Sequence, residues 1–295
     1  MFQFFANIFG YLLNFINNFV GNYGLAIILF TVLIKIIMLP LSIKQQRTMK
    51  KSTELNEKIK VLQFKYKNDP EKLNREMMDL YKKENMSPFS GCLSTIAQFI
   101  LLISIFYMVR CPLTYMEKIN NDQINTYVQQ LKDGGITVNQ AYSEIDIIRE
   151  LDYLKEKMPE DEGLNKINLN MNFCGLDLSK IPQQNLNDWT VYIIPALYII
   201  STFISMKITT SMQKKNKKND GVIDITEKEE KDSKEEEKNE MEDMMEQSNK
   251  MMSWMMPIMS VSISLVAPLG LALYWLVNNI LMIGERLVLN KIIKD

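Results

Sequence analysis

The segment YGLAIILFTVLIKIIMLPLSI, residues 23–43, carries one charged side chain, that of Lys35. As a helix rising about 1.5 Å per residue, it is long enough to cross a hydrocarbon core of about 30 Å. No charge precedes the segment, whereas four basic residues follow it: Lys44, Arg47, Lys50 and Lys51. The positive-inside rule therefore places its start outside and its end in the cytoplasm, and the segment predicts an integral membrane protein.

Apolar blocks of similar length recur along the chain and alternate with charged segments. They predict an all-α membrane protein with five transmembrane helices, at 23–43, 88–109, 189–210, 251–268 and within 269–291, a range that also includes the cytoplasmic tail. The last two share one apolar block, which is expected to turn at Ala267-Pro268-Leu269-Gly270. Five crossings place the N-terminus outside and the C-terminus in the cytoplasm.

The connection after the first span, residues 44–87, is expected to form a cytoplasmic helical hairpin. Leu55, Ile59 and Leu62 recur at near-helical spacing in its first half. Pro70 follows directly after Asp69 and is well placed to open the second helix.

Two other connections are polar. Residues 110–188 predict an external segment with a helix at 141–157 and an alternating stretch at 167–178 that suits a strand. Residues 211–250 are rich in Lys, Glu and Asn and lack aromatics, which is typical of a charged cytoplasmic linker. Around the start of the next span, methionines cluster at helical spacing. The cluster is either an adaptable binding surface or a lipid-facing helix end. They are Met241, Met244, Met245, Met251, Met252, Met255, Met256 and Met259.

Residues 1–22 have no basic start and no small-residue cleavage site, which argues against a cleaved signal peptide. Polar or small residues recur there at helical spacing among Phe, Ile and Leu: Gln3, Asn7, Gly10, Asn14, Asn17 and Gly21. This pattern predicts an uncharged amphipathic helix in the membrane interface, with an atypical signal anchor as the alternative.

Composition argues against an enzyme. The chain has no histidine, and its three cysteines, Cys92, Cys111 and Cys174, lack the paired spacing of a zinc site. A nucleophile at Cys92 would have no histidine partner anywhere. We therefore expect no catalytic residue, no metal and no cofactor. The net charge of −1 indicates no particular polar partner, and no specific nucleic acid is expected.

Lys35 lies about 18 Å of helix rise below the outer end of its span. A charge near the middle of the membrane costs about 2.5–3.5 kcal/mol on insertion scales, so it needs an explanation. Either its long side chain reaches the cytoplasmic headgroups, or it faces a water-filled cavity among the helices.

Uncharged polar residues in three expected spans favour a shared hydrophilic pocket around Lys35. They are Thr31, Gln98, Trp275, Asn278 and Asn279. The acid nearest to a span, Glu285, is close to the inner boundary, so Lys35 is expected to be unpaired and available to an anion.

Cys111 and Cys174 both fall in the expected external segment, where a disulfide can persist in an aerobic organism. The alternative is that Cys111 is buried as a small hydrophobe and both thiols stay reduced.

Five motifs in order resemble the YidC/Oxa/Alb family of membrane protein insertases. They are TVLIKIIMLPL (31–41), KYKNDPEKLNREMMDLYKKENMSP (65–88), GCLSTIAQF (91–99), YIIPAL (192–197) and MPIMSVSISLVAPLGLALYWLVNN (256–279). Lys35 stands where the family normally has an arginine, and Ser94 replaces a usual proline. The resemblance is to the Gram-positive-like type, without a large extracytoplasmic domain.

The resemblance implies a groove open to the cytoplasm and to lipid, in a multi-pass protein of the bacterial plasma membrane. Its substrate-binding residues would be Lys35, Thr31, Gln98, Trp275 and Asn278. It implies nascent membrane proteins and the lipid bilayer as partners, and from the family alone also a ribosome and a Sec translocon. A solute channel or transporter is the main rival, since an intramembrane lysine also suits an anion path, but no internal repeat supports it.

Overall fold

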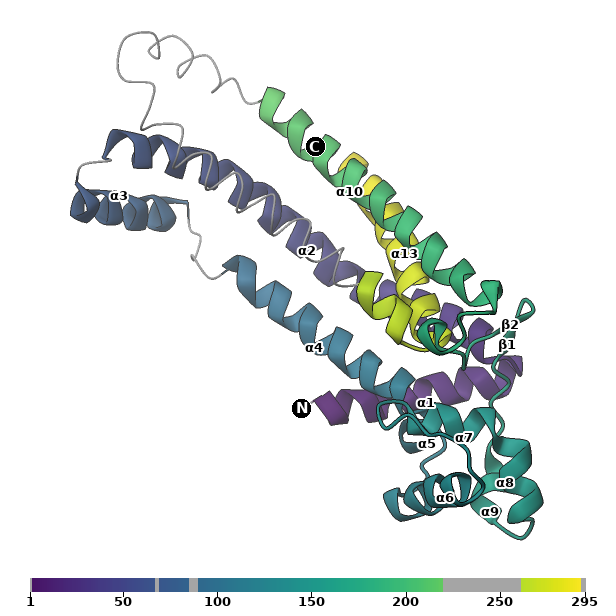
Figure 1. The fold of residues 1–295 in the computed structure, drawn as a ribbon. Coiled ribbons are helices and arrows are strands. Elements are labelled where there is room, and N and C mark those ends of the chain that lie inside the picture. Colours follow the sequence, from purple (N-terminus) through teal and green to yellow (C-terminus); the bar gives the residue numbers. More distant parts are fainter. Residues whose placement is uncertain (1, 67–68, 85–89, 220–260, 293–295) are drawn as a thin grey trace.

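The protein is described by a computed structural model that covers residues 2–66, 69–84, 90–219 and 261–292. Long helices make up most of these residues (Figure 1). They are α1 (Phe2–Val20), α2 (Tyr23–Lys65), α3 (Pro70–Lys83), α4 (Ser90–Arg110), α10 (Ile193–Asn219) and α13 (Leu269–Ile292). In Figure 1, α2, α4, α10 and α13 run alongside one another, α1 crosses them near one end, and α3 folds back at the other.

Three of the described helices are long and apolar enough to cross a membrane: Tyr23–Thr48, Trp189–Ser211 and Leu269–Asn290. A shorter apolar helix covers Phe99–Arg110. Residues 261–266 are helical, but the rest of the expected fourth span and most of the expected linker and methionine cluster lie outside the described residues. The fold is thus that of a mostly helical membrane protein with three clear candidate spans.

Helix α2 is continuous for 43 residues, so the first helix of the expected hairpin is an extension of the first span. Pro40 lies inside it without ending it. The side chain of Asn22 caps its start by accepting a hydrogen bond from the Leu25 N–H, at 3.0 Å. Helix α3 begins at Pro70 as predicted, with Asp69 as its N-cap.

Residues 111–192, which we call the cap, fold into short elements at the α1 end of the long helices (Figure 1). They are α5 (Pro112–Tyr115), α6 (Asn121–Asp133), α7 (Ser143–Arg149), α8 (Leu151–Lys157), α9 (Glu162–Lys166), β1 (Asn172–Phe173), β2 (Leu176–Asp177), η1 (Pro182–Gln184) and η2 (Trp189–Tyr192). Tyr127, Leu131, Ile147, Leu154 and Leu164 are fully buried, so the cap has an apolar core, which is continuous with that of the long helices.

Three expectations for the cap need correction. Helix α6 was not anticipated. The single helix expected at 141–157 is two helices, because the backbone turns at Glu150 between α7 and α8. The expected strand is a hairpin of two-residue strands, whose turn at Cys174-Gly175 has positive φ at both residues. The alternation itself is real, since Ile167, Leu169 and Met171 are buried between exposed asparagines.

Helix α1 turns the middle of its polar stripe, Gly10, Asn14 and Asn17, toward the protein, whereas Gln3 and Asn7 are exposed. The Asn14 amide donates to the carbonyl of Met116 at 2.9 Å, and the Asn17 amide donates to the carbonyl of Asn168 at 3.1 Å. Its aromatic stripe, which includes Phe4, Tyr11, Phe15 and Phe19, is exposed. An exposed aromatic face on a helix that crosses the bundle end suits contact with lipid, in line with the predicted interfacial helix.

The cap also fixes the starts of α2 and α13 side by side. The Tyr23 N–H donates to the carbonyl of Asn170 at 3.0 Å, and the Gly270 N–H donates to the carbonyl of Leu178 at 2.9 Å. Gly270 faces Tyr23 across the contact between the two helices. Since both helices start at the cap, they run parallel, and this register decides which side chains meet further along.

Candidate functional site

Lys35 of α2 and Glu285 of α13 form an ion pair. The Lys35 ammonium donates a hydrogen bond to Glu285 Oε2, with a nitrogen–oxygen distance of 3.3 Å. The side chains are 24% and 14% exposed, so the pair is mostly buried but not sealed. The expectation of an unpaired lysine was therefore wrong.

The physical reason lies in helix register. Lys35 lies about 18 Å of helix rise from Tyr23, and Glu285 about 24 Å from Leu269. The long side chains of Lys35 and Glu285 together bridge this difference in depth, so the lysine has a specific partner inside the protein. Sequence reasoning set Glu285 aside for its depth, although opposite charges in two spans were a signal for pairing.

The other predicted groove residues are placed differently. Thr31 is buried, and its hydroxyl donates to the Ile27 carbonyl of its own helix at 2.6 Å. Trp275 is half-buried, with its ring centroid 6.1 Å from that of Tyr198 on α10. Asn278 is half-buried, and helical spacing puts it on the same face of α13 as Glu285. Gln98 belongs to α4, but its side chain lies outside the described part of the structure.

A second polar contact joins α13 to α10. The Asn279 amide, which is buried, donates to the hydroxyls of Ser201 at 3.0 Å and Thr202 at 3.1 Å. One helical heptad further on, the Arg286 guanidinium donates to the hydroxyl of Thr209. Sequence analysis missed this seam, although Ser201, Ser205 and Thr209 recur every four residues as on one helix face.

Two adjacent faces of α13 thus have different roles. Asn279 and Arg286 face α10, whereas Glu285 faces α2. Since neighbours in sequence point about 100° apart on a helix, Arg286 can bond to α10 while Glu285 pairs with Lys35.

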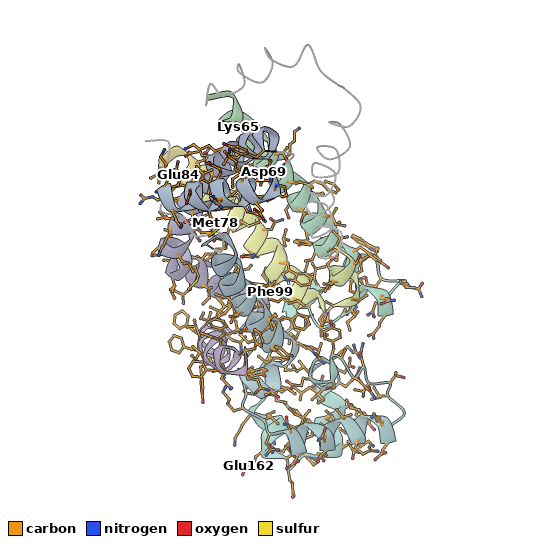
Figure 2. The ribbon with its side chains drawn as sticks, turned by 90° about the vertical axis from the view of Figure 1, so that its left-hand side faces the viewer. Lys65, Asp69, Met78, Glu84, Phe99 and Glu162 are labelled. Atoms are coloured by element: carbon orange, nitrogen blue, oxygen red, sulfur yellow. The ribbon has the colours of Figure 1, made fainter. Side chains whose placement is uncertain are left out.

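The end of the molecule opposite the cap has a small polar cavity. It has a volume of about 90 Å³ and is lined by Lys51, Glu54, Leu55, Lys58 and Glu84. The Lys58 ammonium pairs with Glu84 at 2.5 Å; this hydrogen bond raises the pKa of Lys58 and lowers that of Glu84. In Figure 2, Glu84, Asp69 and Met78 lie at this end, Phe99 lies in the middle on α4, and Glu162 lies at the cap end.

Glu144 is a buried carboxyl group in the cap. It is 6% exposed and accepts hydrogen bonds from the Thr114 N–H at 3.0 Å and from the Thr114 hydroxyl at 2.6 Å. Burial raises its pKa above the ordinary 4.5, and the two Thr114 bonds oppose that shift. It ties α7 to α5, next to the end of α4.

Cys111 and Cys174 are free thiols. Cys111 is largely buried beside Glu144. Burial is the main cause that raises the pKa of the Cys111 thiol to about 12, and the negative charge of Glu144 is the second cause. Cys111 therefore matches the alternative of a small buried residue. The described residues contain no group of three or more side chains suited to a metal ion.

Comparisons with known proteins fit this geometry. The family described as 60Kd inner membrane protein matches residues 15–295. The protein named membrane protein insertase YidC of Caldanaerobacter subterraneus subsp. tengcongensis is 48% identical over 101 residues, which are 34% of this chain and 49% of that protein. The protein of the same name from Francisella tularensis subsp. novicida is 46% identical over 109 residues, 37% of this chain and 20% of that protein.

The matched segment thus spans about half of the first relative and a fifth of the second. The family match, in contrast, extends over nearly all of the chain and includes both Lys35 and Glu285. The protein therefore belongs to the 60Kd inner membrane protein family, the YidC/Oxa group of multi-pass membrane proteins.

Proposed function

We propose that this protein is a non-enzymatic insertase that receives nascent membrane proteins in a hydrophilic groove and releases their apolar segments into lipid. The observation that carries the proposal is Lys35, a charged and partly exposed side chain inside a candidate span of a family member. A charge at that depth is costly, and intramembrane ionisable residues usually mark a path for a polar substrate.

The proposed topology has five spans, with the N-terminus and the cap outside and the hairpin and C-terminus in the cytoplasm. It is supported by the basic residues that follow the apolar part of α2 and by the basic end of α13. The expected fourth span, 251–268, is part of this proposal. The protein would lie in a bacterial cell membrane.

In the proposed mechanism, the polar tail of a new membrane protein enters the groove from the cytoplasm. Its carboxylates are drawn to Lys35, and Gln98 and Asn278 offer hydrogen bonds to its backbone. The adjoining apolar segment leaves sideways into lipid past Thr31 and Trp275. The groove lowers the barrier because charge and water replace hydrocarbon around the polar tail. No covalent step is needed.

Two features support a groove that opens beside α2. The α10–α13 contact is fixed by the Asn279 and Arg286 hydrogen bonds, whereas α2 is joined to α13 by the Lys35–Glu285 ion pair. Such a pair can exchange partners without unfolding either helix. We further propose that the hairpin meets the incoming chain, with a ribosome and a Sec translocon as partners that the family suggests.

The lysine itself tests the proposal in proteoliposomes that contain the purified protein. The substrate would be a single-span protein with two aspartates in its translocated tail. We expect Lys35→Arg to retain insertion, and Lys35→Ala and Lys35→Glu to lose most of it. Full activity of Lys35→Glu on this substrate would contradict the proposal.

Lys35→Ala leaves Glu285 without its partner, and an uncompensated buried charge costs about 3–5 kcal/mol. The matched control is therefore Lys35→Ala combined with Glu285→Gln, which removes both charges. We expect this double variant to melt close to the wild type and still to insert the acidic substrate poorly. Wild-type insertion by the double variant would show that the charge is dispensable.

A further inference from the structure

The Lys35 ammonium already has an anion when no substrate is present. Its hydrogen bond to Glu285 has a nitrogen–oxygen distance of 3.3 Å, and both side chains lie in candidate spans. In such surroundings, opposite charges attract more strongly than in water. An incoming carboxylate would therefore compete with Glu285 for the Lys35 ammonium.

Glu285 is suited to this role because its ion pair is with Lys35, although the positive charge of Arg286 also lies close to it. Arg286, the next residue, points to α10 and donates to Thr209. The ion pair recorded for Glu285 within the described residues is the one with Lys35. The partial exposure of both side chains leaves room for a third group to approach the pair.

We propose that Glu285 is a specificity-determining residue, an internal counter-ion that competes with the acidic tail of a substrate for Lys35. This inference rests on the proposed insertase function. A tail with one carboxylate exchanges one ion pair for another and gains little. A tail with several carboxylates can pair with Lys35 through one carboxylate while its other carboxylates remain in water. The counter-ion therefore restricts strong capture to clearly acidic tails.

The test is a ratio of insertion yields in proteoliposomes at limiting protein. Two substrates differ only at one tail position, aspartate in one and asparagine in the other. For wild type we expect the aspartate-to-asparagine ratio to be close to one. For Glu285→Gln, which keeps the shape of the side chain and removes its charge, we expect the ratio to rise roughly tenfold, the equivalent of one charge-assisted hydrogen bond.

Glu162→Gln is the matched control, because Glu162 also takes part in an ion pair, with Lys166, but on the exposed surface of the cap (Figure 2). We expect its ratio to equal that of wild type. A Glu285→Gln ratio within about twofold of wild type would overturn the inference. So would an equal fall for both substrates, which would mark Glu285 as merely structural.

Two further variants keep the test decisive if Glu285→Gln is unstable. Lys35→Gln combined with Glu285→Gln should fold, since neither charge is left alone, and should show a ratio of one. Glu285→Asp should stay close to wild type, because the counter-ion is kept. A raised ratio in the double variant would overturn the inference. Failure of wild type to insert any substrate would instead reject the proposed function.

Discussion

At Gly10, helix α1 comes against the backbone of α5. A Cβ atom on this residue would overlap the carbonyl group of Tyr115, which no rotamer change can move aside. We therefore expect Gly10→Ala to destabilise the protein by about 1–3 kcal/mol, the usual cost of overpacking. Thermal unfolding of the purified protein in detergent micelles measures the change.

Gly284 provides the matched control in the same assay. It is exposed in α13, and a Cβ atom there would meet no heavy atom within 4 Å. Gly284→Ala should be neutral or stabilise by about 0.5–1 kcal/mol, because alanine favours the helix. A Gly10→Ala variant that melts like wild type would contradict the close seating of α1 on the cap.

The Lys35–Glu285 pair shows what a sequence can say about one residue. The cost of a charge at mid-membrane was enough to single out Lys35, but the sequence analysis expected it to be unpaired and did not identify Glu285 as its partner. The identity of that partner depends on the register of α2 against α13. Cap residues 170 and 178 fix this register through hydrogen bonds to Tyr23 and Gly270, and nothing local in the sequence encodes it.

Among the elements, the cap contains a buried titratable group, Glu144, that links α7 to α5. Burial raises the pKa of Glu144 in the folded protein, so between 4.5 and that raised pKa the folded state binds more protons than the unfolded state. Stability should therefore fall as pH rises through this range. Each unit by which the pKa is raised changes the free energy of unfolding by about 1.4 kcal/mol across this range.

The Glu144→Gln side chain keeps an oxygen that can accept a hydrogen bond from Thr114, but it cannot ionise. We expect its melting temperature to fall less than that of wild type between pH 5 and pH 8. A residual slope should remain, because burial also raises the pKa of Glu117 and of Asp146. Glu162→Gln, at an exposed position, should keep the wild-type slope. If the melting temperature falls equally with pH in wild type and in Glu144→Gln, Glu144 is not the source of the pH dependence.

The elements were predictable where a local signal exists. Pro70 and Asp69 mark the start of α3, and the low charge of 23–43 marks the first span. The cap helices were missed or merged because they are short and held by tertiary packing. Helix α6, for example, is polar apart from four residues: Ile124, Tyr127 and Leu131, which are buried in the cap core, and Val128, which is partly buried.

For the whole molecule, the continuous α2 matters most. It carries the Lys35 site and the first half of the hairpin on one 43-residue helix, about 65 Å long at 1.5 Å per residue. Under the proposed function, contact of a nascent chain with the hairpin would reach the Lys35–Glu285 pair along one continuous helix. The number of crossings and the orientation in the membrane remain predictions.

The most direct test of the insertase account is site-specific photo-crosslinking to a ribosome-stalled, single-span nascent chain in membrane vesicles. The probe would replace Asn278, on the face of α13 that carries Glu285, or the half-buried Trp275 beside Tyr198 of α10, or Ile280, which is exposed on the face opposite Asn278. We predict crosslinks to the nascent span from positions 275 and 278, lost in Lys35→Glu, and only background from position 280. Equal crosslinking at all three positions, or at 280 alone, would contradict a groove beside Lys35.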